Sequence, residues 1–344
     1  YRGAVTRDLG TAQQQVASAL VKEANHADKA IRSEALKAIG KLGIQDLAPQ
    51  VYTKLKTDPS QEVKVEALHA LVAMDAPNLS EAISFAMRDV SEQVRVAGLG
   101  LISQTSLPND QKVPLLMEIL TKRTLAEQQK ALLTLGSLPG SKESPVWTSI
   151  LADFSAGKLP AGTWVELEEA IMATEDSKLK STYDKLLTEK SGGEPWRAYA
   201  GALAEGDVRK GRSIFFQNQT AQCIRCHAYS DMGGNAGPAL DTIGKTLSRE
   251  ELLIALVEPS KRLAPGYGTI NLTLAGGEKV TGLLLEDSST KFRIQVGTAL
   301  REIPKSEVTN SSIAPSSMPP MGTLLSKREL RDLVSYLVTL NRSE

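Results

Sequence analysis

The chain has 344 residues, of which 41% are hydrophobic and 23% charged, and this composition excludes disordered and fibrous classes. Its length exceeds what one hydrophobic core usually spans, so we expect two or three domains. Lys plus Arg and Asp plus Glu number 40 each, so no global charge excess favours nucleic acid or an anionic membrane as a partner. No apolar run is long enough to predict a transmembrane segment.

A repeat with helical character runs through the first half of the chain. Similar segments rich in Val, Arg or Lys, Ala and Leu recur about every 32 residues, a period typical of helix-pair repeats. They align on Leu36, Leu68, Leu99 and Leu132. Asp58-Pro59-Ser60 precedes the second copy and supplies turn and N-cap residues. We therefore expect each copy to form a pair of helices.

The repeat resembles the HEAT family, in which an Asp-Pro turn, a Val-Arg pair and an Ala-Leu pair are common near the start of the second helix. The resemblance implies a HEAT-like α-solenoid over residues 1–190. Helical patterns at 164–172 and 179–187 are expected to cap it, because a solenoid needs a polar outer face at its end. Solenoids of this kind commonly present a concave surface to a partner.

The second half of the chain has a different pattern. Residues 191–205 begin with Ser191-Gly192-Gly193-Glu194-Pro195 and are predicted to be a linker. In the second domain, 206–344, helices are expected near 247–258 and 326–340. A β-rich insertion at about 266–308 is expected to form a meander or small barrel. Its predicted strands are 269–274, 279–285, 291–296 and 299–303. The predicted fold is therefore mainly α, with one small β-rich insertion.

Cys223-Ile224-Arg225-Cys226-His227 contains both cysteines of the chain. This spacing lets two thiols add to the two vinyl groups of one haem while the following histidine turns its imidazole to the iron. We therefore predict one covalent haem c, attached through Cys223 and Cys226 and ligated by His227. A disulfide framework elsewhere is excluded, because no other cysteine is present.

Three other interpretations of the motif compete with haem attachment. A structural zinc site needs about four ligands, and the remaining histidines, His26 and His69, lie in the repeat region. A thioredoxin-type redox pair needs a βαβ setting, whereas the flanking sequence is helical and loop-like. A chance match is the third interpretation, and the presence of only two cysteines in the chain argues against it.

A methionine is the expected second axial ligand, because a low-spin electron carrier needs a second strong ligand. Met318 stands directly before the C-terminal helix, where its thioether would favour the reduced iron and raise the potential. Met321 is the second candidate, and Met232 lies too near His227 in sequence to reach the opposite side of the haem. The competing interpretation is that these methionines fill gaps in the core.

Pro238 has two interpretations. Its carbonyl oxygen can accept the Nδ1 proton of His227, which fixes the tautomer and leaves Nε2 for the iron. Alternatively, Gly237-Pro238 is an ordinary loop turn.

Together with residues of the first and last helices of this domain, the motif resembles class I cytochrome c. Segment 206–216 is similar to the N-terminal helix of that family, with Gly211 and Phe215 four residues apart. Leu333 and Tyr336 match the residues on the last helix that cross it. The resemblance implies that Gly211 lets the two helices approach closely.

The β-rich insertion is similar to a more specific type, the haem-binding domain of the Pirellula/Verrucomicrobium type. The residues that carry this resemblance are Glu258-Pro259-Ser260, Ala264-Pro265-Gly266-Tyr267 and Ser317-Met318-Pro319-Pro320. The match covers about 206–344. The class I resemblance implies in addition that Pro238 orients the histidine and that Met318 is the sixth ligand. In that family the domain is commonly the C-terminal module of a secreted or membrane-associated dehydrogenase, often after helical repeats.

The resemblance implies a bacterial, periplasmic or otherwise extracytoplasmic electron-transfer module that accepts electrons from a sugar or alcohol dehydrogenase domain or partner protein. The chain starts at Tyr1 without a signal-peptide pattern, which we interpret as a processed form or a fragment. No nucleotide-binding fingerprint or histidine-based catalytic constellation is apparent, so we expect no enzyme activity of its own.

Two other functions stay open. One is a haem enzyme of peroxidase type, in which the sixth ligand is displaced. The other is a repeat-based interaction protein in which the haem only reports redox state. The sequence does not decide the oligomeric state.

Overall fold

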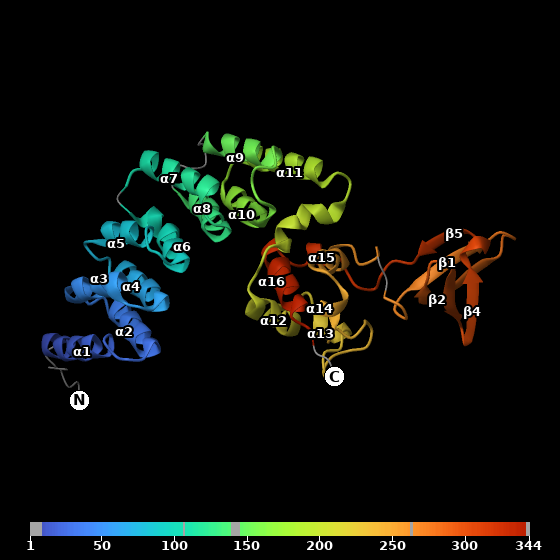
Figure 1. Cartoon of the computed structure of the whole chain (residues 1–344), viewed down its shortest axis with the longest axis horizontal. Helices are drawn as coiled ribbons and strands as arrows, with labels where there is room; N and C mark the ends of the chain where they lie inside the picture. The colour runs from blue at the N-terminus through green and yellow to red at the C-terminus, as the bar shows by residue number, and fades with distance from the viewer. Residues whose placement is uncertain (1–8, 106, 139–144, 262–263, 342–344) are drawn as a thin grey trace, which may run out of the picture. The chain divides into compact units, whose positions relative to one another are not determined.

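The computed structural model describes residues 9–105, 107–138, 145–261 and 264–341 (Figure 1). It contains two compact units, each with its own internal contacts. The first comprises Tyr1–Leu159 and Glu166–Tyr183, and the second comprises Pro160–Val165 and Asp184–Glu344. Within the described residues, no helix combines the length and apolar character needed to cross a membrane.

The first unit is helical, as the repeat pattern predicts. Its helices are α1 (Leu9–Glu23), α2 (Lys29–Leu42), α3 (Ala48–Thr57), α4 (Gln61–Ala73), α5 (Leu79–Ala86), α6 (Glu92–Leu101), α7 (Asn109–Lys122), α8 (Leu125–Ser137) and α9 (Val146–Ser155), with α10 (Trp164–Ala173) and α11 (Ser177–Ser191), each shared in part with the second unit. Two short 3-10 helices, η1 (Gln45–Leu47) and η2 (Ile102–Gln104), connect them.

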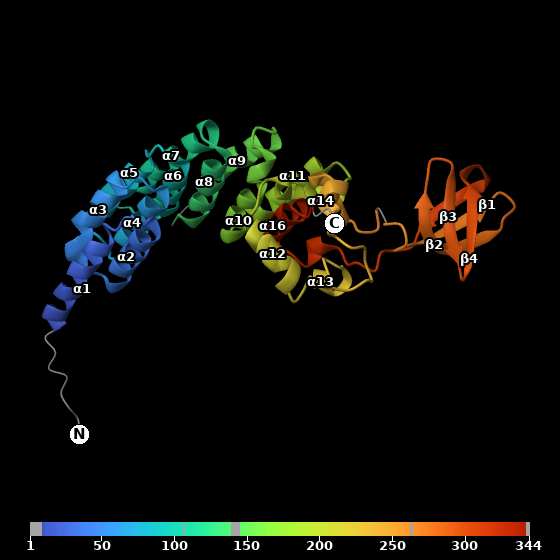
Figure 2. The same cartoon turned by 60° about the horizontal axis from the view of Figure 1, so that its bottom comes forward.

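The repeated leucines lie on the second helix of each pair. Helices α2, α4, α6 and α8 pack successively on one another, which Figures 1 and 2 show as an ordered stack within this unit. The aligned leucines are Leu36, Leu68, Leu99 and Leu132, all at most 2% exposed. Local capping residues start these helices: Asp28 accepts from Ala30 N, and Thr124 forms a capping box with Glu127. Stacking of the second helices thus buries a continuous core.

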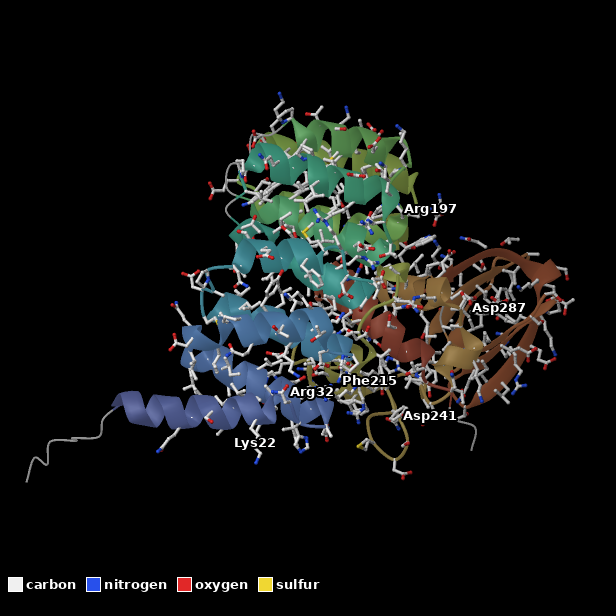
Figure 3. All side chains as sticks on the ribbon, turned by 60° about the vertical axis from the view of Figure 1, so that its left-hand side comes forward. Lys22, Arg32, Arg197, Phe215, Asp241 and Asp287 are labelled. Carbon is white, nitrogen blue, oxygen red and sulfur yellow. The ribbon has the colours of Figure 1, made fainter. Side chains whose placement is uncertain are left out.

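A series of ion pairs accompanies the stack. Four residues before each of the first three aligned leucines, a basic side chain of α2, α4 or α6 meets an acidic one from further along the chain. The pairs are Arg32–Asp58 at 2.9 Å, Lys64–Asp89 at 2.8 Å and Arg95–Glu127 at 2.8 Å. Arg32, labelled in Figure 3, also donates to the carbonyl oxygens of His26 and Ala27, so the buried charges have hydrogen-bond partners.

The second unit contains a helical part and a sheet. Its helical segments are η4 (Ala161–Thr163), η5 (Pro195–Leu203), α12 (Val208–Gln217), α13 (Cys223–Cys226), α14 (Ile243–Thr246), α15 (Arg249–Val257), η7 (Met321–Thr323) and α16 (Lys327–Val338). Asp207 caps α12, while Ser248 and Ser326 form capping boxes at α15 and α16. The helices therefore begin where the sequence supplies N-cap side chains.

Helices α12 and α16 cross at close range. A Cβ atom on Gly211 would lie 2.0 Å from the carbonyl oxygen of Asp332 and 2.7 Å from Cβ of Tyr336, so only glycine fits at the crossing. Phe215, labelled in Figure 3, is 1% exposed, and its ring centroid lies 5.7 Å from that of Tyr336. Leu333 is fully buried in the same core. The close approach that the resemblance implied for Gly211 is therefore present.

The segment predicted as a linker, 191–205, differs from that prediction. Residues Pro195–Leu203 form η5, which packs on α15 and α16, and Ala202 is fully buried. A Cβ on Gly201 would lie 3.0 Å from the backbone nitrogen of Val165, so 160–165 joins the same unit. The Gly and Pro residues at the start of the segment suggested a spacer, but its Trp, Tyr, Ala and Leu side chains give it apolar surface to bury.

An antiparallel sheet lies between α15 and α16 in the sequence. Its strands are β1 (Thr269–Leu274), β2 (Lys279–Asp287), β3 (Lys291–Val296), β4 (Ala299–Pro304) and β5 (Val308–Ile313). They lie in the order β4-β3-β2-β1-β5, and the turn η6 (Lys305–Glu307) precedes β5. Alternating residues such as Ile270, Leu272 and Ile294 form its buried face. The first four strands match the predicted ones. The prediction missed β5, which is almost entirely exposed and polar, so the insertion continues to 313 instead of 308.

Candidate functional site

Cys223 and Cys226 lie on α13, a single helical turn that brings both thiols to one cavity. Gln222 precedes this turn with φ 46°, an uncommon conformation for a residue other than glycine. The backbone N–H of His227 donates to the carbonyl oxygen of Cys223 at 3.0 Å and closes the turn. Neither cysteine forms a disulfide. The structure therefore brings the three predicted residues Cys223, Cys226 and His227 together on the lining of one cavity.

The imidazole of His227 is held by Pro238. Nδ1 of His227 lies 2.8 Å from the carbonyl oxygen of Pro238. Because a carbonyl oxygen only accepts, Nδ1 carries the proton and donates it, and in the neutral ring the acceptor nitrogen is then Nε2. This contact is the one that the first interpretation of Pro238 predicts, and it orients the ring as such contacts do in metal-binding histidines.

Gly237 lies against the face of the same imidazole. A Cβ atom at this position would lie 2.6 Å from Cε1 and 2.8 Å from Nδ1 of His227, closer than van der Waals contact allows. The backbone N–H of Gly237 also donates to the carbonyl oxygen of Cys226 at 2.8 Å. Gly237 therefore both anchors the loop on α13 and leaves room for the ring. No sequence signal predicted this second role.

The cavity has a volume of about 490 Å³, within the range of small-molecule and cofactor sites. Its lining is mostly apolar and comes from several elements of the second unit. Representative apolar lining residues are Ile243, Leu247, Leu252, Leu256, Leu333 and Leu337. Burying a large apolar ligand here would remove its surface from water.

Met318 lies on the cavity lining, as the sequence prediction requires of an axial ligand. Its side chain is partly buried, and its backbone N–H donates to Oγ of Ser316 at 3.1 Å. Met321 also lines the cavity but is only 3% exposed and belongs to the hydrophobic core. Met232 is 53% exposed, and its backbone pairs with Tyr229. Met318 and Met321 therefore both reach the cavity, whereas Met232 is not part of its lining.

Segments on either side of the sheet also line the cavity, and the sequence did not reveal this. Ala264, Pro265 and Tyr267 precede β1, whereas Ser316 and Ser317 follow β5. Pairing of β1 with β5, in which Ile270 lies opposite Ile313, brings the two ends of the insertion together. The Ala264-Pro265-Gly266-Tyr267 motif marked the first of these segments in the sequence. Its contact with the segment of Met318 was not predictable, because it depends on the pairing of β1 with β5, and β5 was not predicted.

Burial affects the chemistry of the first cysteine. Desolvation raises the pKa of the Cys223 thiol to about 11, and the neighbouring Cys226 contributes in the same direction. Cys223 is therefore a neutral thiol near pH 7 and a weak nucleophile for disulfide exchange.

Among the described residues, no group of three or more His, Cys, Asp or Glu side chains is arranged to hold a metal ion.

Several basic residues of the second unit have structural partners. Lys261 pairs with Glu194 at 2.6 Å and Glu258 at 3.2 Å. Arg249 donates to the carbonyl oxygen of Ala204 at 2.9 Å and to Oγ of Ser335, and burial lowers its pKa. Arg225 is exposed and donates to Gln222. Arg262 lies outside the described residues.

Comparison with known families identifies the repeats. A family model described as HEAT repeats matches residues 17–95, which covers α2, α3, α4 and α5 completely. The predicted HEAT-like repeats are therefore confirmed for this part of the chain. Comparison with curated proteins gives no match.

Proposed function

We propose that the second unit binds one haem c through Cys223 and Cys226, with His227 and Met318 as axial ligands, and transfers single electrons. The observation that supports this most strongly is the hydrogen bond from His227 to Pro238 on a cavity that both cysteines and Met318 also line. It leaves Nε2 of the histidine available to the metal.

The residues present fit the proposed group. The cavity offers two thiols, one imidazole, two thioethers, of which we assign Met318 as the ligand, and a largely apolar lining of suitable volume. A bound haem supplies a one-electron redox couple. The Pro238 carbonyl would hold the proton on Nδ1, the apolar side chains would exclude water, and the thioether of Met318 would favour the reduced state of the group. These residues would raise the reduction potential relative to bis-histidine ligation.

The test is expression of the chain in a host that attaches haem to Cys-Xaa-Xaa-Cys-His motifs. We expect one haem per chain that resists extraction by acid and organic solvent, and none retained in the Cys223→Ala/Cys226→Ala double variant. The oxidised protein should show the weak near-infrared band of methionine–iron ligation, and Met318→Ala should remove it. Extractable haem in the wild type would contradict covalent attachment.

Binding of carbon monoxide separates electron transfer from a peroxidase-type activity. With Met318 as a firm ligand, we expect the reduced wild-type protein to bind carbon monoxide slowly or not at all. The Met318→Ala variant should bind it promptly. Prompt binding by the wild type would favour the haem-enzyme alternative.

For the first unit we propose a protein-interaction role, because stacked HEAT repeats form extended binding surfaces. Its partner would be an extracytoplasmic bacterial dehydrogenase that delivers electrons to the second unit. Measuring haem reduction by candidate dehydrogenases, with free repeat unit added as a competitor, tests this role. Slower reduction in the presence of the competitor is expected, and an unchanged rate would leave the repeats without a role in that transfer.

A further inference from the structure

Two segments contact the loop that carries Met318, one on each side. Residues 258–261, which follow α15, contact its N-terminal side, and residues 194–199, which precede α12, contact its C-terminal side. Trp196 N donates to Oε1 of Glu258 at 2.8 Å, and Lys261 joins Glu194 at 2.6 Å. We call residues 194–199 and 258–261 together the brace, because these bonds tie the two stretches to each other.

The brace reaches Met318 from its N-terminal side through two serines. Ser316 N donates to Oγ of Ser260 at 3.0 Å, and Met318 N donates to Oγ of Ser316 at 3.1 Å. Each serine hydroxyl thus accepts a backbone N–H of the loop. The path from Ser260 to Met318 consists of two consecutive hydrogen bonds.

The brace reaches the same loop from its C-terminal side through Tyr199. A Cβ on Gly322 would lie 2.6 Å from Cζ of Tyr199, so the ring packs directly on the backbone there. The Tyr199 hydroxyl lies 3.5 Å from the carbonyl oxygen of Gly322, at the limit of a hydrogen bond. The loop between Ser316 and Gly322 is therefore fixed at both ends, with Met318 between them.

We infer that the brace positions Met318 as the axial ligand, with Ser260 and Ser316 as positioning residues that set how firmly the thioether stays on the iron. This inference rests on the proposed function. A loop that is already ordered loses little conformational entropy when its side chain binds, so ligation is stronger. Loosening the loop lowers the effective concentration of the thioether at the metal and favours an external competitor.

The experiment uses the oxidised full-length protein and titrates it with imidazole, following loss of the methionine–iron band. We expect Ser260→Ala and Ser316→Ala each to raise the apparent imidazole affinity about threefold, and the double variant about tenfold, as expected for loss of modest hydrogen bonds. Ser316→Thr retains the hydroxyl and should bind imidazole like the wild type.

Ser288→Ala is the matched control. Ser288 Oγ accepts from Lys291 N at 3.1 Å, the same kind of side-chain-to-backbone bond, but in the turn between β2 and β3. It should leave imidazole affinity unchanged. In the haem-free protein, Ser316→Ala should also accelerate hydrogen exchange at the Met318 amide, a readout independent of bound haem.

Two negative results have different meanings. A normal methionine band with wild-type imidazole affinity in both serine-to-alanine variants would overturn the positioning role and leave the proposed function intact. A wild-type protein without covalent haem or without the methionine band would overturn both.

Discussion

Gly237, which has no side chain, leaves room for the imidazole ring of His227. Its backbone approaches the His227 ring so closely that a Cβ would lie 2.6 Å from Cε1. The adjacent Pro238 carbonyl fixes the tautomer at 2.8 Å. Orientation and protonation of the imidazole thus depend on two consecutive residues of one loop.

Replacing Gly237 by alanine tests this dependence. The added methyl group must displace either the loop or the imidazole, so we expect about tenfold less haem bound per chain under limiting haem, a typical cost of disturbing a ligand's support. The pyridine haemochrome absorbance measures this yield. Gly276→Ala is the control, because a Cβ there meets nothing within 4 Å. Equal yields for the two variants would contradict the role assigned to Gly237.

Cys223, Cys226 and His227 could be selected as candidates at the residue scale because the covalent chemistry of haem attachment fixes the spacing it needs. Pro238 was a reasonable candidate because it follows them by a short loop. Ser260 and Ser316 were not predictable as partners, since they are 56 residues apart and meet only after the sheet has formed.

Among the elements of the first unit, α6 and α8 are joined by a nearly buried ion pair. The Arg95 guanidinium donates to both carboxylate oxygens of Glu127, at 2.8 and 3.1 Å. These bonds hold the pKa of Glu127 below its usual value, against the opposing effect of burial. A carboxylate whose folded-state pKa is lowered stabilises the fold above its unfolded pKa and loses that contribution as pH falls through the folded value.

We therefore expect the free energy of unfolding of the repeat unit to decrease as pH falls below about 4.5, the ordinary value for glutamate. Glu127→Gln keeps the capping box at α8 but removes the charge. It should cost about 2 kcal/mol at pH 7 and flatten this pH dependence. Urea denaturation followed by amide exchange in α6 and α8 measures both. Glu118→Gln, at an exposed position of α7, should change neither.

Most elements were predictable because their periodicity and caps are local. The capping residues Ser248 and Ser326 and the alternation in β1 to β4 mark these segments in the sequence. The sequence prediction missed β5 and η5 for opposite reasons. β5 is a polar edge strand that forms only through its pairing with β1, so its sequence has no apolar alternation. η5 is apolar, but the glycine and proline residues just before it predicted a linker.

At the scale of the whole molecule, each unit has its own core, and every lining residue of the cavity belongs to the second. Two units with separate cores are expected to respond separately to core mutations. Asp58 in the first unit has a side chain 1% exposed and pairs with Arg32. Gly211 lies at the helix crossing of the second unit.

Asp58→Ala should destabilise the repeat unit by about 3 kcal/mol, because it leaves the Arg32 charge buried without its partner. Gly211→Ala should destabilise the second unit by about 3 kcal/mol, because the added Cβ overpacks the α12–α16 crossing. Amide exchange in α2 to α4 reports on the first unit, and haem absorbance during urea denaturation reports on the second. Each variant should shift only its own signal, and a shift of both signals by either variant would contradict separate cores.

The sequence by itself determined the helical repeat and four of the strands, and it supplied the Cys-Xaa-Xaa-Cys-His motif and the candidate ligands of the proposal, because each depends on local spacing, capping or periodicity. Only the tertiary structure decided that Pro238 meets the His227 ring, that Gly237 makes room for it, and that 191–205 is largely packed. The same holds for the brace at Met318. These contacts join residues whose separation along the chain is set by loops and by the sheet, and only packing brings them together.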